Sequence, residues 1–136
     1  MEERKDDIYS LIDTGQNLFI TGKAGTGKTT LLKQITSEHK GECVVVAPTG
    51  VAAINAEGVT IHNLFSLDIG VQNPEEPFAW KLPAAKKAIL RKVKILIIDE
   101  ISMVRCDLMD AIDRRLRSVK KSSLAFGGIQ VIMFGD

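Results

Sequence analysis

The sequence predicts an α/β fold built on a doubly wound, mainly parallel sheet with helices on both faces. Unbroken apolar runs such as Cys43–Ala47 and Ile95–Ile98 are typical of strands that are covered on both sides. They alternate along the chain with segments of helical spacing, and the links between them are short. A glycine-rich loop, Gly22–Thr29, follows the first expected strand, and ligands bind beyond the carboxyl ends of strands in such sheets.

The first third of the chain predicts a helix, a strand and a second helix. A stop at Thr14–Gly15 closes a short amphipathic helix, whose apolar stripe is Ile8, Leu11 and Ile12. The first strand starts at Leu18. After the glycine-rich loop, a second apolar stripe predicts a helix that ends near His39, and its members are Leu31, Leu32 and Ile35.

The rest of the chain continues the alternation. Cys43–Ala47 is the second strand, and a Pro-Thr-Gly sequence separates it from a short helical stretch over residues 51–56. Residues 67–83 show little periodicity and contain three prolines, so we expect an irregular excursion before a basic helix at about Ala84–Arg91. The third strand, Ile95–Ile98, precedes a helix with a core face at Leu108, Met109, Ile112 and Leu116. A fourth strand is expected at Ile129–Phe134.

Composition limits the possible functions. A chain of 136 residues has the size of one domain, and its net charge of +1 predicts no general attraction to a polyanion, so any nucleic-acid surface must be local. The start is too charged for a secretory signal and no apolar run is long enough to span a membrane, which favours a cytosolic or nuclear protein. Cys43 and Cys106 lack metal or disulfide spacing, so both are expected to be buried or half-buried bystanders.

The glycine-rich loop indicates a nucleoside triphosphate site, because Gly22–Thr29 fits the pattern G-x-x-x-x-G-K-[ST] without a mismatch. In this pattern the glycines let backbone N–H groups close on the phosphates. Lys28 reaches the outer phosphates, and the Thr29 hydroxyl coordinates Mg²⁺. The expected nucleotide contacts are Gly22, Ala24, Gly25, Thr26, Gly27, Lys28, Thr29 and Thr30.

The strand Ile95–Ile98 delivers Asp99 and Glu100 at its carboxyl end, where the second half of such a site belongs. Asp99 is expected to hold Mg²⁺ through water. Glu100 is placed to orient the attacking water and accept its proton, so Glu100 and Lys28 are the expected catalytic residues, and hydrolysis is favoured over transfer to an acceptor. The alternative is that the acid pair only caps the following turn.

Four ordered stretches closely resemble the petite integration frequency (Pif) helicases: residues 19–29, Ala47–Ala53, Thr60–His62 and Ile98–Met103. The resemblance covers nearly the whole chain. It implies a RecA-like phosphate-loop fold and the first motor domain of a superfamily-one, 5′-to-3′ DNA helicase. Such a motor uses ATP and Mg²⁺, moves on single-stranded DNA as a monomer and serves DNA repair, recombination and telomere maintenance. It would work in the cytoplasm of a bacterium or the nucleus of a eukaryote.

By the same resemblance, residues 47–53 and 60–65 would line the single-strand path, and the expected DNA contacts are Thr49, Gly50, His62 and Asn63. From the sequence alone His62 would more often be a packed helix-start residue, and the resemblance reverses that preference. Phe65 and Trp80 are secondary candidates for stacking on bases, although isolated aromatics beside aliphatics are more often core. A run of cations is more often a solvated face than a DNA contact: Lys86, Lys87, Arg91, Lys92 and Lys94.

The sequence departs from the family pattern at both ends. The glutamine that contacts the adenine ring in the family is absent from Lys5–Asp7, and Gln16 is too near the strand to replace it. The end, Gly127–Asp136, resembles the approach to the third helicase motif and stops before the glutamine expected next. Residues 1–136 are therefore expected to be a first RecA-like ATPase domain truncated at that motif.

Motors of this family complete the γ-phosphate site with arginines from a second RecA-like domain, which 136 residues cannot also hold. We therefore expect the chain alone to bind nucleotide, hydrolyse it slowly and not unwind DNA. Its expected partners are single-stranded DNA and the second domain of the parent chain. The alternative is an AAA-type switch or loader ATPase that acts as a nucleotide-dependent binding module, but no sensor arginine or lid domain is visible.

Overall fold

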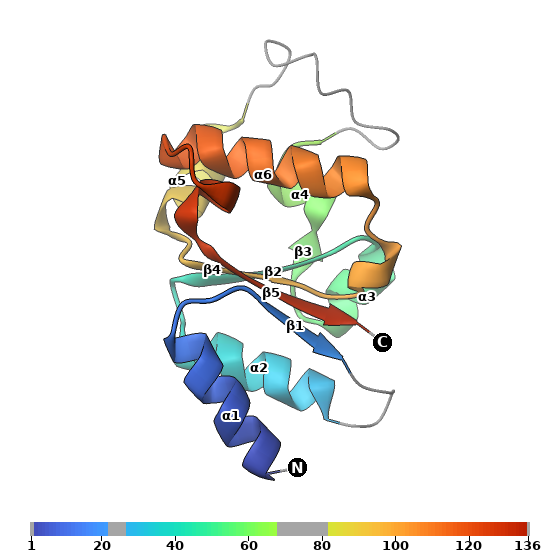
Figure 1. Ribbon diagram of the computed structural model, residues 1–136. Helices are drawn as coiled ribbons and strands as arrows, with labels where there is room; N and C mark the ends of the chain where they lie inside the picture. Colours follow the sequence, from blue (N-terminus) through green and yellow to red (C-terminus); the bar gives the residue numbers. More distant parts are fainter. Residues whose placement is uncertain (1, 22–26, 68–81, 136) are drawn as a thin grey trace.

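The computed structural model describes residues 2–21, 27–67 and 82–135, and Figure 1 shows them as a central sheet between two layers of helices. The elements are α1 (Glu2–Asp13), β1 (Leu18–Thr21), α2 (Lys28–Glu38), β2 (Cys43–Ala47), α3 (Gly50–Asn55), β3 (Val59–Thr60), α4 (Ile61–Leu64), α5 (Ala84–Lys92), β4 (Ile95–Ile98), the 3₁₀ turn η1 (Ile101–Met103), α6 (Cys106–Lys120), the 3₁₀ turn η2 (Ala125–Gly128) and β5 (Gln130–Gly135). None of these described helices combines the length and apolar composition that crossing a bilayer requires.

The described strands form one sheet in the order β1-β5-β4-β2-β3, and every neighbouring pair is parallel. The prediction of a doubly wound parallel sheet is therefore confirmed. Because β5 lies between β1 and β4, the carboxyl ends of β1 and β4 emerge at the same edge, one strand apart. This order brings the segment after β1 close to the acidic pair that follows β4.

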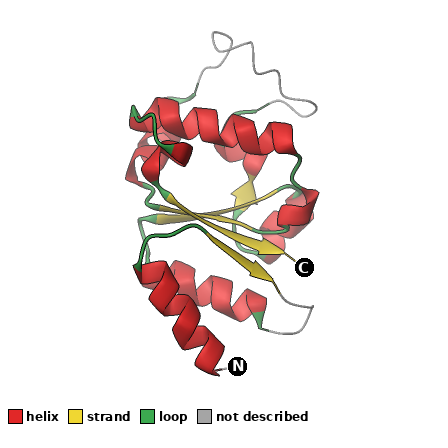
Figure 2. Cartoon of the chain, in the orientation of Figure 1, coloured by secondary structure: helices red, strands yellow, loops and turns green. Residues whose placement is uncertain are grey.

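Helices cover both faces of the sheet (Figures 1 and 2). In β4, Leu96 and Ile98 point into the core formed with α4, α5 and α6, whereas Ile95 and Ile97 point into the core formed with α1 and α2. All four side chains are buried. Because alternate residues face opposite sides of a strand, a strand covered on both sides must be apolar throughout, which explains the unbroken run in the sequence.

The strands and longer helices lie within a few residues of their predicted positions, but the segment after α3 was not predicted. The two-residue strand β3 (Val59–Thr60) pairs in parallel with β2, and the four-residue helix α4 follows directly. Elements this short carry no readable periodicity. In α1 the predicted stripe is only partly correct, because Ile12 is buried while Leu11 is 43% exposed.

The two cysteines differ in their surroundings. Cys43, the first residue of β2, is half-buried, and burial raises the pKa of its thiol to about 11, although a hydrogen bond with the Thr36 side chain works in the opposite direction. Cys106, the first residue of α6, is exposed, so the expectation that it would be buried or half-buried is wrong. The first position of a helix lies at its end, where packing against the sheet is weakest.

Candidate nucleotide-binding site

A pocket of about 510 Å³ lies at the carboxyl edge of the sheet. It is open to solvent, and four segments distant in the sequence contribute to it: the start of α2, the end of α3, the link between β4 and η1, and the end of β5. Its lining residues are Gly27, Lys28, Thr29, Thr30, Leu32, Asn55, Ala56, Asp99, Glu100 and Phe134. The structure thus brings the described part of the predicted phosphate loop, residues 27–29, together with both predicted acids.

The start of α2 has the geometry of an anion site. Gly27 precedes the helix with a φ of 91°, a left-handed conformation that glycine adopts without steric cost. As a glycine, this N-cap residue offers no side chain that could cap the helix. The first N–H groups of a helix have no intrahelical partner, and the helix dipole places partial positive charge there. The start of α2 is therefore suited to bind phosphate. Four further predicted contacts lie outside the described residues: Gly22, Ala24, Gly25 and Thr26.

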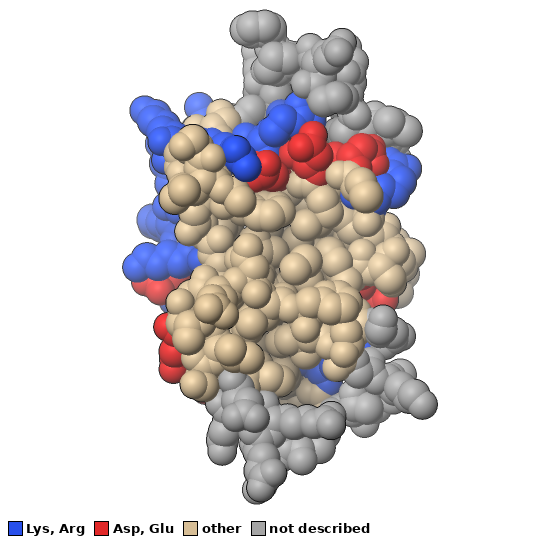
Figure 3. Space-filling view, in the orientation of Figure 1, with Lys and Arg blue, Asp and Glu red and all other residues tan. Residues whose placement is uncertain are grey.

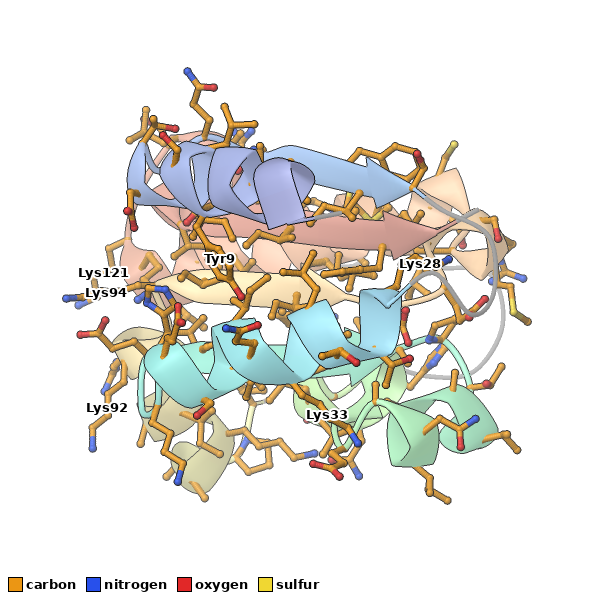
Figure 4. The ribbon with its side chains drawn as sticks, turned by 90° about the horizontal axis from the view of Figure 1, so that it is seen from below. Tyr9, Lys28, Lys33, Lys92, Lys94 and Lys121 are labelled. Atoms are coloured by element: carbon orange, nitrogen blue, oxygen red, sulfur yellow. The ribbon has the colours of Figure 1, made fainter. Side chains whose placement is uncertain are left out.

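Lys28 connects the start of α2 to β5. Its half-buried ammonium group donates a hydrogen bond of 3.3 Å to the carbonyl oxygen of Gly135, the last residue of β5. Figure 4 shows Lys28 at the edge of the sheet where the strands end. A Cβ atom at Gly135 would lie 2.7 Å from Cγ2 of Ile101, so glycine is required there for η1 to pack against β5. That packing keeps the acidic pair beside Lys28.

The acidic pair occupies a sharp turn at the end of β4. The N–H of Asp99 still donates to Val46 in β2 at 2.9 Å, and Oδ1 of Asp99 accepts the N–H of Glu100 at 3.0 Å. Glu100 is exposed and has a φ of 55°. A left-handed conformation at a residue other than glycine costs on the order of 1–3 kcal/mol and clusters at functional sites. The Glu100 side chain makes no capping hydrogen bond to η1, so the alternative that the pair only caps the turn fails for Glu100.

The four predicted DNA contacts follow two neighbouring strands. Thr49 and Gly50 come after β2, while His62 and Asn63 lie in α4, directly after β3, and Ala47 pairs with Thr60 in the register of these strands. Thr49 is half-buried and caps α3, because its Oγ1 accepts the N–H of Ala52 at 3.2 Å. Gly50 is exposed, and a Cβ there would meet nothing within 4 Å. His62 is half-buried, and Asn63 is exposed.

The secondary DNA candidates have mixed outcomes. Phe65 is fully buried in the core, so it cannot stack on a base, and Trp80 lies outside the described residues. Lys86 donates hydrogen bonds to the carbonyl oxygen of Asn63 and, at 3.5 Å, to Ser66 Oγ, which places it against α4. Lys94 pairs with Glu42 at 3.1 Å. The other predicted cations, Lys87, Arg91 and Lys92, are exposed on α5.

Two features of the structure were not predicted, one in the pocket and one at the opposite edge of the sheet. Asn55 and Ala56, at the end of α3, line the pocket, and only the crossing from β2 through α3 brings them there. Gln130, the first residue of β5, is 8% exposed and donates from Nε2 to the carbonyl oxygens of Ile12 and Gln16 at 3.1 and 2.8 Å. Gln130 therefore ties β5 to the segment before β1. A polar residue opening an otherwise apolar strand was the available signal.

A parallel sheet in this order, with a glycine-led helix facing an acidic pair across one pocket, defines the class of RecA-like phosphate-loop domains. A family model described as PIF1-like helicase matches residues 2–136. The chain belongs to the PIF1-like helicase family. This membership favours the motor over the AAA-type switch.

The relatives agree with this membership. The chain is 35% identical to the ATP-dependent DNA helicase PIF1 of Emericella nidulans, covering 98% of this chain and 19% of the relative. It is 37% identical to the human ATP-dependent DNA helicase PIF1, covering 100% of this chain and 21% of the relative. It thus spans about a fifth of the length of these relatives.

Solved structures show the same relationship. The Pif1 helicase from Bacteroides in complex with ADP-AlF3 and ssDNA is 52% identical and superposes with a TM-score of 0.92, covering 98% of this chain and 32% of that one. Pif1 helicase from Candida albicans is 32% identical with a TM-score of 0.84, covering 97% of this chain and 31% of that one.

Proposed function

We propose that this chain is the ATP-binding and hydrolysing domain of a 5′-to-3′ DNA helicase that couples hydrolysis to movement on single-stranded DNA. The observation that carries the proposal is the single pocket that gathers residues 27–30 with Asp99 and Glu100. The Bacteroides relative is in complex with ADP-AlF3 and ssDNA, which supports a nucleotide and single-stranded DNA as the two ligands of this chain. We propose the 5′-to-3′ direction of movement from family membership. Roles in DNA repair, recombination and telomere maintenance are proposed on the same basis, in a bacterial cytoplasm or a nucleus.

In the proposed mechanism, N–H groups at the start of α2 hold the phosphates. Lys28 exchanges its bond to the Gly135 carbonyl for the outer phosphates. The Thr29 hydroxyl and the Asp99 carboxylate line the same pocket and are oxygen donors of the kind that Mg²⁺ prefers, so they fit a metal site. When bound, Mg²⁺ would neutralise charge on the phosphates. Glu100 orients the attacking water and accepts its proton.

The proposed DNA path runs over Thr49, Gly50, His62 and Asn63. These residues follow adjacent parallel strands, so they can contact successive parts of one backbone. Open space over Gly50 admits a close approach of phosphate to the N–H groups there. Contacts of this kind do not depend on base identity, which suits a motor that moves along any sequence.

We further propose that the chain is a first RecA-like domain whose own turnover is slow. An arginine supplied by a second domain accelerates phosphoryl transfer by about 10³ to 10⁵ in related enzymes. The chain spans only 19–21% of two curated relatives, which leaves ample length in those proteins for such a domain. The chain alone should therefore bind nucleotide without unwinding DNA, because unwinding needs two domains that move against each other.

The first test is nucleotide binding by Lys28→Ala, measured by titration with a fluorescent ATP analogue in the presence of Mg²⁺. Removing an ammonium group that contacts phosphate should weaken binding by about tenfold or more, because charge-assisted bonds contribute roughly 1.5–3 kcal/mol. Lys33→Ala is the matched control, since Lys33 is an exposed lysine of the same helix that pairs with Glu57. Equal affinities for both variants would contradict the proposed site.

The second test separates binding from chemistry. Glu100→Gln keeps the shape of the side chain and removes its basicity, so nucleotide affinity should stay within about twofold while hydrolysis falls by about 10² to 10⁴, the usual contribution of a general base. Phosphate release under single-turnover conditions measures this fall. An unchanged hydrolysis rate would assign the general base to another residue.

A further inference from the structure

The end of the molecule opposite the pocket carries a cluster of cations. It forms where the end of α5, the link to β4 and the end of α6 meet, and we call it the basic end: Arg91, Lys92, Lys94, Lys120 and Lys121. Lys120 holds these segments together, because its ammonium group donates to the carbonyl oxygens of Arg91 and Val93, both at 2.7 Å. Figure 4 shows Lys92, Lys94 and Lys121 at the end of the sheet away from Lys28.

The basic end is strongly positive, although the chain as a whole is almost neutral. The whole chain has a net charge of +1. Within the basic end, the ion pair that the structure shows is Lys94 with Glu42, at 3.1 Å, and both side chains remain largely exposed. Figure 3 shows lysine and arginine side chains gathered along the side of the molecule where α5 and the end of α6 lie. Arg91, Lys92 and Lys121 are exposed, so a partner can reach them, whereas the half-buried Lys120 is held by its two carbonyl acceptors.

Helix stability accounts for only part of this cluster. Arg91, Lys92 and Lys120 lie in the last turns of their helices, where cations interact favourably with the helix dipole. Lys94 lies outside both helices. Lys121 ends α6 with a φ of 51°, a position where glycine or asparagine is preferred. Burial and the charge of Lys94 lower the pKa of Lys120, so these like charges are gathered against their mutual repulsion.

We propose that the basic end binds the phosphate backbone of duplex DNA. Duplex DNA carries one charge per roughly 1.7 Å of helix axis, a higher charge density than a single strand has. A patch that binds by charge alone is therefore better suited to duplex than to single-stranded DNA. Single-strand sites combine cations with aromatic side chains on which bases stack. Among the aromatic side chains that the structure describes, Phe65 and Phe134 are buried, Phe19 is in β1, and the Tyr9 hydroxyl is buried. Phe126 lies in η2, next to Gly127, which contacts Lys120, and its side chain packs against the core.

This surface is separate from the proposed single-strand path, which follows the carboxyl ends of β2 and β3. A motor that tracks one strand through its carboxyl edge while its opposite end holds duplex would stay close to a junction between single-stranded and duplex DNA. The duplex contact requires neither the nucleotide nor its hydrolysis, so it can fail without affecting the proposed ATPase, and the ATPase can fail without affecting it.

The test compares binding of a fluorescent blunt-ended duplex by the chain and by Lys92→Gln/Lys121→Gln, followed by anisotropy across a range of salt concentrations. Both lysines are exposed. Each phosphate contact contributes about 0.9 to the slope of log affinity against log salt, so the double variant should lower that slope by about 1.8 and weaken binding about fivefold or more at low salt. Lys33→Glu changes the net charge by the same amount elsewhere on the surface and should lose less than about twofold.

Three further measurements complete the test. Lys92→Arg/Lys121→Arg keeps the charge and should retain the affinity of the unmodified chain, which separates charge from folding. Lys28→Ala should also bind duplex normally. With oligothymidine of equal length, the double glutamine variant should lose less affinity than with duplex. The proposal would be overturned if the unmodified chain does not bind duplex, or if Lys33→Glu loses as much affinity as the double glutamine variant. It would also be overturned if the double glutamine variant loses more affinity for oligothymidine than for duplex, or if polyglutamate added at the same total charge displaces the duplex.

Discussion

At the carboxyl edge of the sheet, polar residues line an open pocket, whereas at the amino edge polar residues bind other parts of the same chain. On the carboxyl side, the N-cap residue of α2 is Gly27, which has no side chain to cap the helix, and Glu100 has a left-handed conformation. On the amino side, Gln130 and Lys120 each donate to two backbone carbonyl oxygens. Asn17 also accepts the N–H of Val131 there, at 2.8 Å.

This difference separates the proposed nucleotide site from the contacts that stabilise the sheet. Uncapped N–H groups and backbone strain do not stabilise a fold, so the presence of both beside one pocket at the carboxyl edge indicates a ligand that uses them. Paired polar groups at the amino edge stabilise the junctions between helices and strands. A rigid amino edge can then hold the strands in place while the carboxyl edge binds and releases its ligands.

The largest expected difference between the two edges is in thiol reactivity. Cys43 lies at the amino edge, and its pKa, raised to about 11 by burial, leaves at least about 100-fold less thiolate at pH 8 than an unperturbed thiol has. Cys106 is exposed, and it begins α6 in the segment that follows the carboxyl end of β4. Alkylation with iodoacetamide at pH 8, followed by peptide mass spectrometry, should therefore modify Cys106 first and Cys43 at least about 100-fold more slowly.

The variants Cys43→Ser and Cys106→Ser assign each alkylation rate to one cysteine, because each variant keeps only one of the two thiols. Equal rates at the two cysteines would mean that the amino edge opens often enough to expose Cys43. The description of that edge as the rigid one would then be wrong.

A smaller effect is expected from Gln130→Ala. The substitution removes a donor from the carbonyl oxygens of Ile12 and Gln16, of which the Ile12 oxygen keeps the N–H of Gly15. It should lower the free energy of unfolding by about 1–3 kcal/mol, as measured by urea denaturation. Nucleotide affinity should stay within about twofold, because Gln130 lies at the opposite edge from the pocket.

Gln34→Ala is the control for this variant, since Gln34 is an exposed glutamine of α2 and its loss should change stability by less than about 0.5 kcal/mol. If Gln130→Ala weakens nucleotide binding as strongly as Lys28→Ala does, the two edges are coupled. The separation of roles described above would then not hold.

Most of the carboxyl edge could be predicted from the sequence, because its signals are local. The pattern around Lys28, the aliphatic run before Asp99 and the Pro-Thr-Gly sequence after β2 each combine a strand with the loop that follows it. Parallel order then brings these loops together. The prediction that Lys28, Thr29, Asp99 and Glu100 share one site is supported by the pocket that they line.

The amino edge could not be predicted in the same way, because its contacts join distant residues. Gln130 and Ile12 are 118 positions apart, and nothing near either residue indicates the pairing. Similarly, Asn55 belongs to the pocket only because α3 returns to the sheet edge. The short β3 and α4 have no periodicity to read, and the exposure of Cys106 depends on how α6 begins.

The most direct test of the central claim is a crystal structure of the chain with Mg²⁺ and a non-hydrolysable ATP analogue. The phosphates should lie at the start of α2, with Lys28 moved from the Gly135 carbonyl to the outer phosphates. Thr29 and Asp99 should face the metal, and Glu100 should face the water beyond the last phosphate. Nucleotide bound away from this pocket, or an empty pocket at saturating nucleotide, would contradict the account.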